Sequence, residues 1–318
     1  MVGAVAYSTK GATVIENVYV SLKDYGVVGK YGGLFGRVWV PDAPGGLEVK
    51  NSCVYLPSMV STTNGFVAGE ITAPATISNC VFIGGNGQDR GYLSDKYDVV
   101  PTIEGTTICS ALEAHKTYKE TLGAFYNVYN ANHPYFALNN ANFTVDTFEG
   151  LTSEIVELTE DIEPVTLSLG NVTGTRVFSG VLDGNGHSIT GLTLTDKPLF
   201  RSLAVATIRN VVIEDVTFKT GQTGVFAYQT LSDVSAPSII DNVYVSVKEF
   251  AYKDGNGTGV IIDRCWSPAV FSDVVIYIPI TYAEMSNNNT RISYVQGKAG
   301  TGEVTLKNCT FIGLVKLG

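Results

Sequence analysis

Three groups of side chains in this sequence have the types and spacing that acid–base chemistry needs. They are Asp183 and His187 in the stretch DGNGH, the neighbours Glu214 and Asp215, and the neighbours Asp263 and Arg264. Paired carboxylates cleave glycosidic bonds as acid and base or hold calcium, and a nearby arginine neutralises an acidic polysaccharide. A polysaccharide lyase or glycoside hydrolase is therefore the catalytic function to weigh.

Each of these groups also has a simpler explanation. D-G-N-G is a strong turn signal, and it recurs at 254–257 without a histidine. Successive side chains of a strand point to opposite faces, so neither Glu214 with Asp215 nor Asp263 with Arg264 is expected to act as a pair. An active site would need carboxylates at matching positions of neighbouring strands, where the aligned strands offer mostly Val, Tyr, Ile and Ser. We therefore expect no catalytic residue and no enzyme activity.

Metal and cofactor sites have no sequence signal either. His115, His133 and His187 lack metal-ligand spacing, and no C-x-x-C pair, phosphate loop or dinucleotide fingerprint occurs. We expect no metal and no cofactor. Cysteines in apolar, strand-like runs usually act as small buried hydrophobes. Those in such runs are Cys53, Cys80, Cys265 and Cys309.

Composition limits the class of protein. The 318 residues include 21 Lys and Arg against 30 Asp and Glu, a net charge of −9, and no basic stretch occurs, which argues against nucleic-acid binding. The chain is 45% hydrophobic and 16% charged, and rich in Gly, Val, Thr and Asn, which favours strands and turns. We see neither a secretory signal nor an apolar run long enough for a membrane helix. The expectation is a β-rich globular protein.

Internal repetition is the strongest pattern in the sequence. Three segments recur in the same order, which chance does not explain. The pairs are IENVYVSLK (15–23) with IDNVYVSVK (240–248), VYLP (54–57) with IYIP (276–279), and NCVFIG (79–84) with NCTFIG (308–313).

A shorter unit of roughly 30 residues recurs inside each copy and contains an Asn before alternating apolar positions. The Asn positions are Asn17, Asn51, Asn79, Asn210, Asn242 and Asn308, with Asp273 standing in once. Asn tolerates left-handed backbone geometry and suits a tight turn. So short a unit buries its apolar face only by stacking on its neighbours. We therefore predict an all-β fold, a right-handed parallel β-helix with equivalent Asn side chains aligned in a ladder.

The segment VFSGVLDGNGHSITGLTL (177–194), followed by PLFRSL and IRNVV, resembles the repeat proteins named for the GLUG motif. GGLFGRV at 32–38 is its nearest counterpart in the first copy, and the loops around 41–46 and 281–289 are lengthened relative to the pattern. The resemblance implies a right-handed parallel β-helix of the pectin-lyase-like kind, typical of bacterial surface and adhesin-like proteins. It says little about biochemical activity, because this fold also hosts lyases and hydrolases.

We divide the chain into three parts. Residues 1–87 hold three β-helix coils, 88–153 form a helix and an aromatic, Asn-rich insertion or cap, and 154–318 hold about five coils. Ser110 and Glu113 form a candidate capping box for a helix within 108–122. The aromatic stretch at 124–143 is either a cap closing the next β-helix or a sugar-stacking surface.

These expectations lead to a non-enzymatic structural or adhesive β-helix of a bacterial cell surface or of a phage fibre or spike, extracellular or on a virion. A glycan or another cell-surface ligand is the expected partner. The first block lacks the opening coils of the second and resembles the C-terminal part of a module. We therefore expect either that the chain is a fragment of a longer tandem-module protein or that its open N-terminal end stacks on an adjacent module or another chain. A polysaccharide lyase or glycoside hydrolase on the same scaffold is the alternative.

Overall fold

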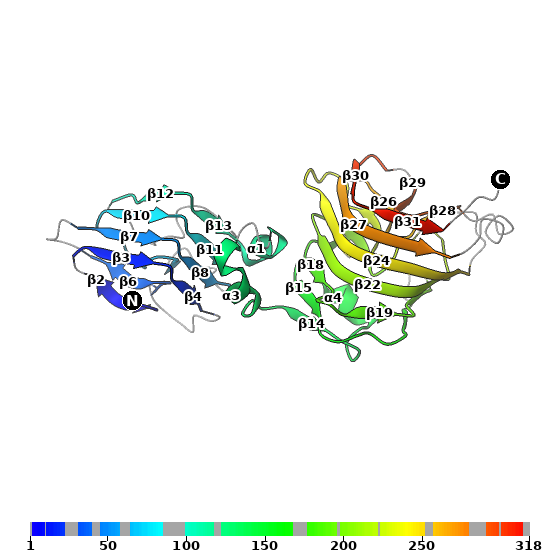
Figure 1. Ribbon diagram of the computed structural model, residues 1–318, viewed down its shortest axis with the longest axis horizontal. Helices are drawn as coiled ribbons and strands as arrows, with labels where there is room; N and C mark the ends of the chain where they lie inside the picture. Colours follow the sequence, from blue (N-terminus) through cyan, green and yellow to red (C-terminus); the bar gives the residue numbers. More distant parts are fainter. Residues whose placement is uncertain are drawn as a thin grey trace. The chain divides into compact units, whose positions relative to one another are not determined.

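The computed structural model describes most of the chain. The described residues are 2–9, 11–22, 31–39, 45–57, 64–84, 99–117, 122–167, 177–195, 198–221, 223–251, 257–279, 291–298 and 300–313. The recurring D-G-N-G at 254–257 and the lengthened loops at 41–46 and 281–289 lie wholly or mostly outside them. The described chain is mostly β, and all its paired strands run parallel (Figure 1).

The chain divides into two compact units, Met1–Pro134 and Tyr135–Gly318. The boundary falls inside the segment expected as an insertion, 88–153. Within the described residues, none of the helices combines the length and apolar character that a membrane crossing requires.

The first unit consists of strands that recur along the chain and pair with their own equivalents. One sheet contains β3 (Thr13–Glu16), β7 (Leu47–Lys50), β10 (Ala75–Ser78) and β12 (Thr102–Glu104). A second contains β4 (Tyr19–Ser21), β8 (Cys53–Leu56), β11 (Val81–Gly84) and β13 (Thr107–Cys109). Shorter sheets join β1 (Val2–Gly3), β5 (Tyr31–Gly32) and β9 (Asn64–Gly65), and β2 (Ala6–Thr9) with β6 (Phe35–Val38). Alternate side chains such as Val49, Leu56 and Phe82 fill the core between them.

The repeat extends further than the three coils expected in 1–87. Strands β12 and β13 pair in parallel with β10 and β11 and form a further layer. That layer was missed because Gly105, with φ of 53°, stands where the earlier layers have Asn. Glycine adopts this conformation without steric cost, so the turn survives while the sequence signature is lost.

Helices follow this last layer. They are α1 (Ala111–Thr117), η2 (Gly123–Phe125) and α3 (Tyr126–Asn130). The predicted capping box is confirmed: the backbone N–H of Glu113 donates to Ser110 Oγ at 3.1 Å, and that of Ser110 donates to Glu113 Oε2 at 2.8 Å. The helix begins after Cys109 rather than at Ile108, because both of these residues belong to β13.

The aromatic stretch at 124–143 packs in two places. Tyr129 is fully buried, and its ring lies 5.1 Å from that of Tyr55 on the outer face of the β4–β13 sheet. The start of the stretch therefore covers the side of the first unit's own sheet instead of closing the next one. Its last residue, Phe143, packs on Phe148 of α4 (Val145–Gly150) within the core of the second unit, as a cap would.

The second unit is built on one long parallel sheet. Its main path runs through β14 (Phe136–Leu138), β15 (Ile155–Leu158), β18 (Val181–Asp183), β22 (Thr207–Phe218), β24 (Ser238–Phe250), β27 (Ala269–Ile278) and β30 (Val304–Lys307), with β16 (Thr166–Leu167), β19 (Ser188–Thr190), β20 (Thr193–Leu194) and β31 (Thr310–Gly313) beside it. A second sheet holds β17 (Val177–Phe178), β21 (Phe200–Leu203), β23 (Ala227–Thr230), β26 (Ile262–Arg264) and β29 (Gln296–Lys298), and β25 (Gly257–Gly259) pairs with β28 (Arg291–Ser293). Phe178 and Phe200, stacked at 4.2 Å, lie in the core shared by these sheets.

The recurring Asn residues adopt the left-handed conformation that we predicted. The φ angles of Asn17, Asn51, Asn79, Asn210, Asn242, Asp273 and Asn308 all lie between 47° and 57°. Strand register aligns each with its equivalent, because the residue just before it pairs with the residue just before the next one. Asn242 Nδ2 donates to Asn210 Oδ1 at 2.9 Å, so the ladder bond is present at this step.

The position after the Asn completes the turn. Ser52 Oγ donates to the carbonyl of Lys50 at 2.8 Å, and Cys80 Sγ contacts the carbonyl of Ser78 at 3.2 Å in the same way. Cys309 Sγ lies 3.4 Å from the carbonyl of Lys307. The expectation that Cys80 and Cys309 are only small hydrophobes is therefore incomplete, since each thiol substitutes for a turn hydroxyl. Cys53 and Cys265 are fully buried, as expected.

Candidate functional site

A row of polar side chains crosses the long sheet of the second unit. Neighbouring strands place them at matching positions, in the order Glu157, Asp183, Arg209, Asp241, Ser272 and Lys307. Their chain neighbours, including Val156, Leu182 and Ile208, point into the core, so the row lies on the outer face. The expectation that aligned strands offer mostly Val, Tyr, Ile and Ser was wrong here, because the residue before each Asn is polar.

Hydrogen bonds within the protein engage the carboxylate of Asp183. Arg209 Nε donates to Oδ2 at 2.7 Å, while Asn210 Nδ2 and the backbone N–H of Asn185 donate to Oδ1 at 3.1 and 2.9 Å. Asp183 and Arg209 are only 3% and 5% exposed. A carboxylate that is buried and held by three donors has little surface left to contact a substrate. Asp241 is likewise engaged, since Ser272 Oγ donates to its Oδ1.

DGNGH forms the expected turn. Asn185 and Gly186 have φ of 50° and 85° and connect β18 to β19. His187 points to Asp161, whose Oδ1 lies 3.5 Å from its Nδ1 and also accepts the backbone N–H of Ser188 at 2.9 Å. These hydrogen bonds lower the pKa of Asp161, that from Ser188 most. Asp183 and His187 thus contact different partners.

We had expected Glu214 and Asp215 to lie on opposite faces of the strand, and they do not. Both are exposed, because Asp215 has φ of 58° and the pairing of β22 with β24 shifts there in a β-bulge. A bulge interrupts the alternation of side chains. No bond between the two carboxylates is present, and the backbone N–H of Asp215 donates to Ser246 Oγ at 2.9 Å. The bulge therefore explains why both carboxylates are exposed, without a catalytic role for either.

Asp263 and Arg264 contact each other, contrary to the expectation. Arg264 Nε lies 3.1 Å from Asp263 Oδ2, and the Asp263 side chain is fully buried. The arginine is the last residue of the three-residue strand β26, and its long side chain can fold back onto its neighbour. Arg264 also lies over the ring of Tyr228, with Cζ 4.7 Å from the centroid. The pair belongs to a packed cluster.

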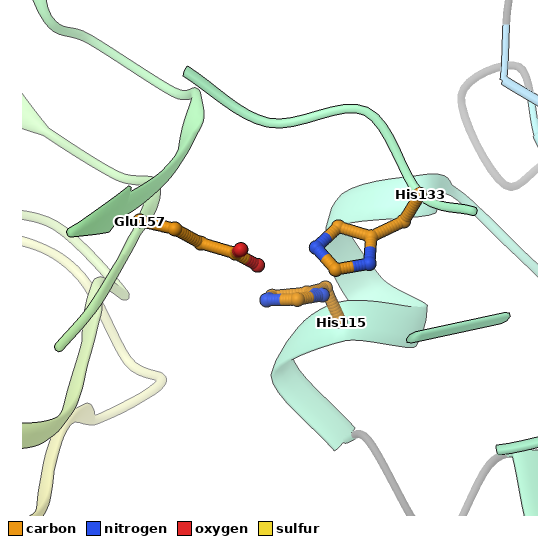
Figure 2. A group of neighbouring side chains, drawn as sticks. All are labelled: His115, His133 and Glu157. Atoms are coloured by element: carbon orange, nitrogen blue, oxygen red, sulfur yellow. The ribbon is translucent and has the colours of Figure 1, made fainter. Parts of the chain in front are cut away.

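Two histidines that looked scattered in the sequence lie side by side in the first unit (Figure 2). The ring centroids of His115, on α1, and His133, just after α3, are 4.5 Å apart. His133 Nδ1 lies 3.1 Å from the carbonyl oxygen of Asn130, and its ring stacks on Tyr129 at 5.3 Å. Two imidazoles are fewer than the ligands of a zinc centre, and we assign no metal to the pair. Glu157, also drawn, belongs to the second unit and to the row described above.

An arginine–aromatic cluster that sequence reasoning missed lies on β2 and β6 of the first unit. Arg37 Cζ lies 5.3 Å from the ring centroid of Tyr7 and 4.5 Å from that of Trp39. Tyr7 is 57% and Trp39 39% exposed, so both rings present surface to solvent. The contact of Arg37 with Tyr7 joins β2 to β6, and the sequence does not reveal that these strands pair.

Comparison with known proteins found no matching family model, no matching curated protein and no matching solved structure. The functional argument therefore depends on the geometry of this chain.

Proposed function

We propose that this protein is a non-enzymatic structural or adhesive repeat protein, extracellular, on a bacterial cell surface or in a phage fibre or spike. Its two units would be right-handed parallel β-helices related to GLUG-motif proteins. The observation that carries the proposal is the column of left-handed Asn and Asp residues in register on successive parallel strands. Stacking of this kind would give each unit regular outer faces, which suits display and contact.

The ion pairs and hydrogen bonds that already engage three aspartate side chains favour this proposal over catalysis. Asp183 is buried and paired with Arg209, Asp263 is buried and paired with Arg264, and Asp241 accepts a hydrogen bond from Ser272. Internal partners of this kind stabilise a fold more readily than they transfer protons. The alternative, a polysaccharide lyase or glycoside hydrolase, is favoured by one observation, the alignment of Glu157, Asp183 and Asp241 on one face.

A glycan array combined with an assay for released reducing ends tests the proposal. We expect binding of one or more glycans without release of reducing ends from any of them. Release from a bound glycan, abolished by Asp241→Asn, would overturn the proposal in favour of the alternative. Asp273→Asn is a matched control, because it removes the same charge from the next strand at a turn position.

A second copy of the chain is the partner that we propose for the ends of the strand stacks. Among the described strands, β3 pairs only with β7 and β30 only with β27, so each has one edge without a neighbour. Within the first unit, Lys50 Nζ lies 3.7 Å from Glu16 Oε2. Pairing β30 of one copy with β3 of another would place Lys307 beside Glu16 and Asn308 beside Asn17. Opposite charges and the Asn column would then continue across the junction.

Solution mass measured by light scattering tests this junction. We expect concentration-dependent assembly that Lys307→Glu weakens and that Lys307→Glu with Glu16→Lys restores. Lys219→Glu is the control, because Lys219 lies outside both edges. A monomer at all concentrations, or equal effects of the two single charge reversals at 307 and 219, would contradict the proposed junction.

A further inference from the structure

The arginine–aromatic cluster of the first unit combines the two features by which proteins bind acidic sugars. Flat aromatic rings pack against the apolar face of a sugar ring, and a guanidinium binds a carboxylate through two parallel hydrogen bonds. Tyr7, Arg37 and Trp39 bring these groups together, with both rings exposed and the guanidinium over both of them. Tyr7 lies on β2 and Arg37 on β6, and these two strands pair in parallel.

The charge of Arg37 distinguishes it from two other arginines. Arg209 and Arg264 each bond a carboxylate, at 2.7 and 3.1 Å. Across the described ranges, Arg37 has no ion pair, and its buried Nε atom has no hydrogen-bond partner. An arginine held between aromatic groups and lacking a carboxylate is prepared to bind one from a ligand, because little side-chain entropy remains to be lost.

We propose that Tyr7, Arg37 and Trp39 form a binding site for a carboxylated sugar. The Arg37 guanidinium binds the carboxylate, and the exposed faces of Trp39 and Tyr7 hold the sugar ring. This inference rests on the proposed adhesive function and names its ligand class.

Titration followed by NMR tests the site on the whole chain. The probe is cellobiouronic acid, which carries one carboxylate, and its methyl ester serves as a neutral probe of the same shape. We expect the acid to bind at least about tenfold more tightly than the ester, a difference of about 1.4 kcal/mol. Arg37→Gln should abolish that difference, and Trp39→Ala should weaken binding of both probes.

Arg201→Gln is the matched control, because Arg201 also lies over a tyrosine ring, with Cζ 5.4 Å from the centroid of Tyr228. It removes the same charge and should leave binding unchanged. Equal affinities for acid and ester, absence of binding, or the same loss in both arginine variants would overturn the inference. Glycans bound on the array without any dependence on Arg37 would overturn this site alone, whereas release of reducing ends would overturn the adhesive function while leaving the site intact.

Discussion

Replacing Asn242 separates the two contributions that the Asn column makes to stability. Its φ of 49° lies in the left-handed region, which costs a non-glycine residue about 1–2 kcal/mol, less for Asn. Its Nδ2 also donates to Asn210, and an exposed bond of this kind contributes about 0.5 kcal/mol. We therefore expect Asn242→Ala to lower the free energy of unfolding by about 1.5 kcal/mol, and Asn242→Gly by about 0.5 kcal/mol, because glycine accepts this backbone.

Thermal unfolding followed by circular dichroism measures these effects. For a unit the size of Tyr135–Gly318, 1 kcal/mol corresponds to roughly 2–4 °C in Tm, so Asn242→Ala should lower Tm by about 3–6 °C. Asn185, with φ of 50° in the DGNGH turn, is the control, because no side-chain hydrogen bond is described for it. There Ala should cost about 1 kcal/mol and Gly almost nothing. An unchanged Tm in Asn242→Ala, or an equal loss in Asn242→Gly, would contradict the stabilising role assigned to this left-handed position.

Three further predictions concern other parts of the chain. Asp183→Asn should lower the free energy of unfolding in urea by about 3–5 kcal/mol, since it leaves Arg209 buried without its carboxylate, and an Asp183→Leu/Arg209→Met variant should lose less. At pH 8, iodoacetamide should label Cys309 first among the five thiols, as peptide mapping will reveal. Burial raises the pKa of Cys109 and Cys265 to about 12 and keeps their thiols protonated; rapid labelling of either would contradict the packing. Ser110→Ala should destabilise α1 by about 1 kcal/mol, seen as faster hydrogen exchange in 111–117 but not in α4.

The parts of the fold that the sequence predicts are those set by local backbone preference. Asn at regular spacing predicts a left-handed residue before each strand, and alternating apolar residues predict that one face of the strand is buried. The layer at β12 and β13 escaped because Gly105 performs the same backbone role without the Asn signature. An Asn at this position therefore indicates the turn, but the turn also forms where another residue replaces the Asn.

The site residues were harder to predict because their contacts join strands far apart in sequence. Arg209 meets Asp183 across 26 positions, and Arg37 meets Tyr7 across a strand pair. The rule that successive side chains face opposite ways failed for Asp215, at a bulge, and for Arg264, at a strand end. One available signal went unused: the residue before each recurring Asn is polar in every copy, which predicts a polar row on the outer face.

The in-register pairing of repeated strands is the claim on which the whole account depends, and a pair of engineered disulfides tests it most directly. Val212 on β22 lies opposite Tyr244 on β24, and Tyr244 lies opposite Val275 on β27. Paired strands are about 4.8 Å apart, within reach of a disulfide, whereas positions two strands apart are about 10 Å distant. In a Cys309→Ser background, oxidised Val212→Cys/Tyr244→Cys should lose two hydrogens by intact mass, and Val212→Cys/Val275→Cys should not. A bridge in the second variant, or none in the first, would contradict the account.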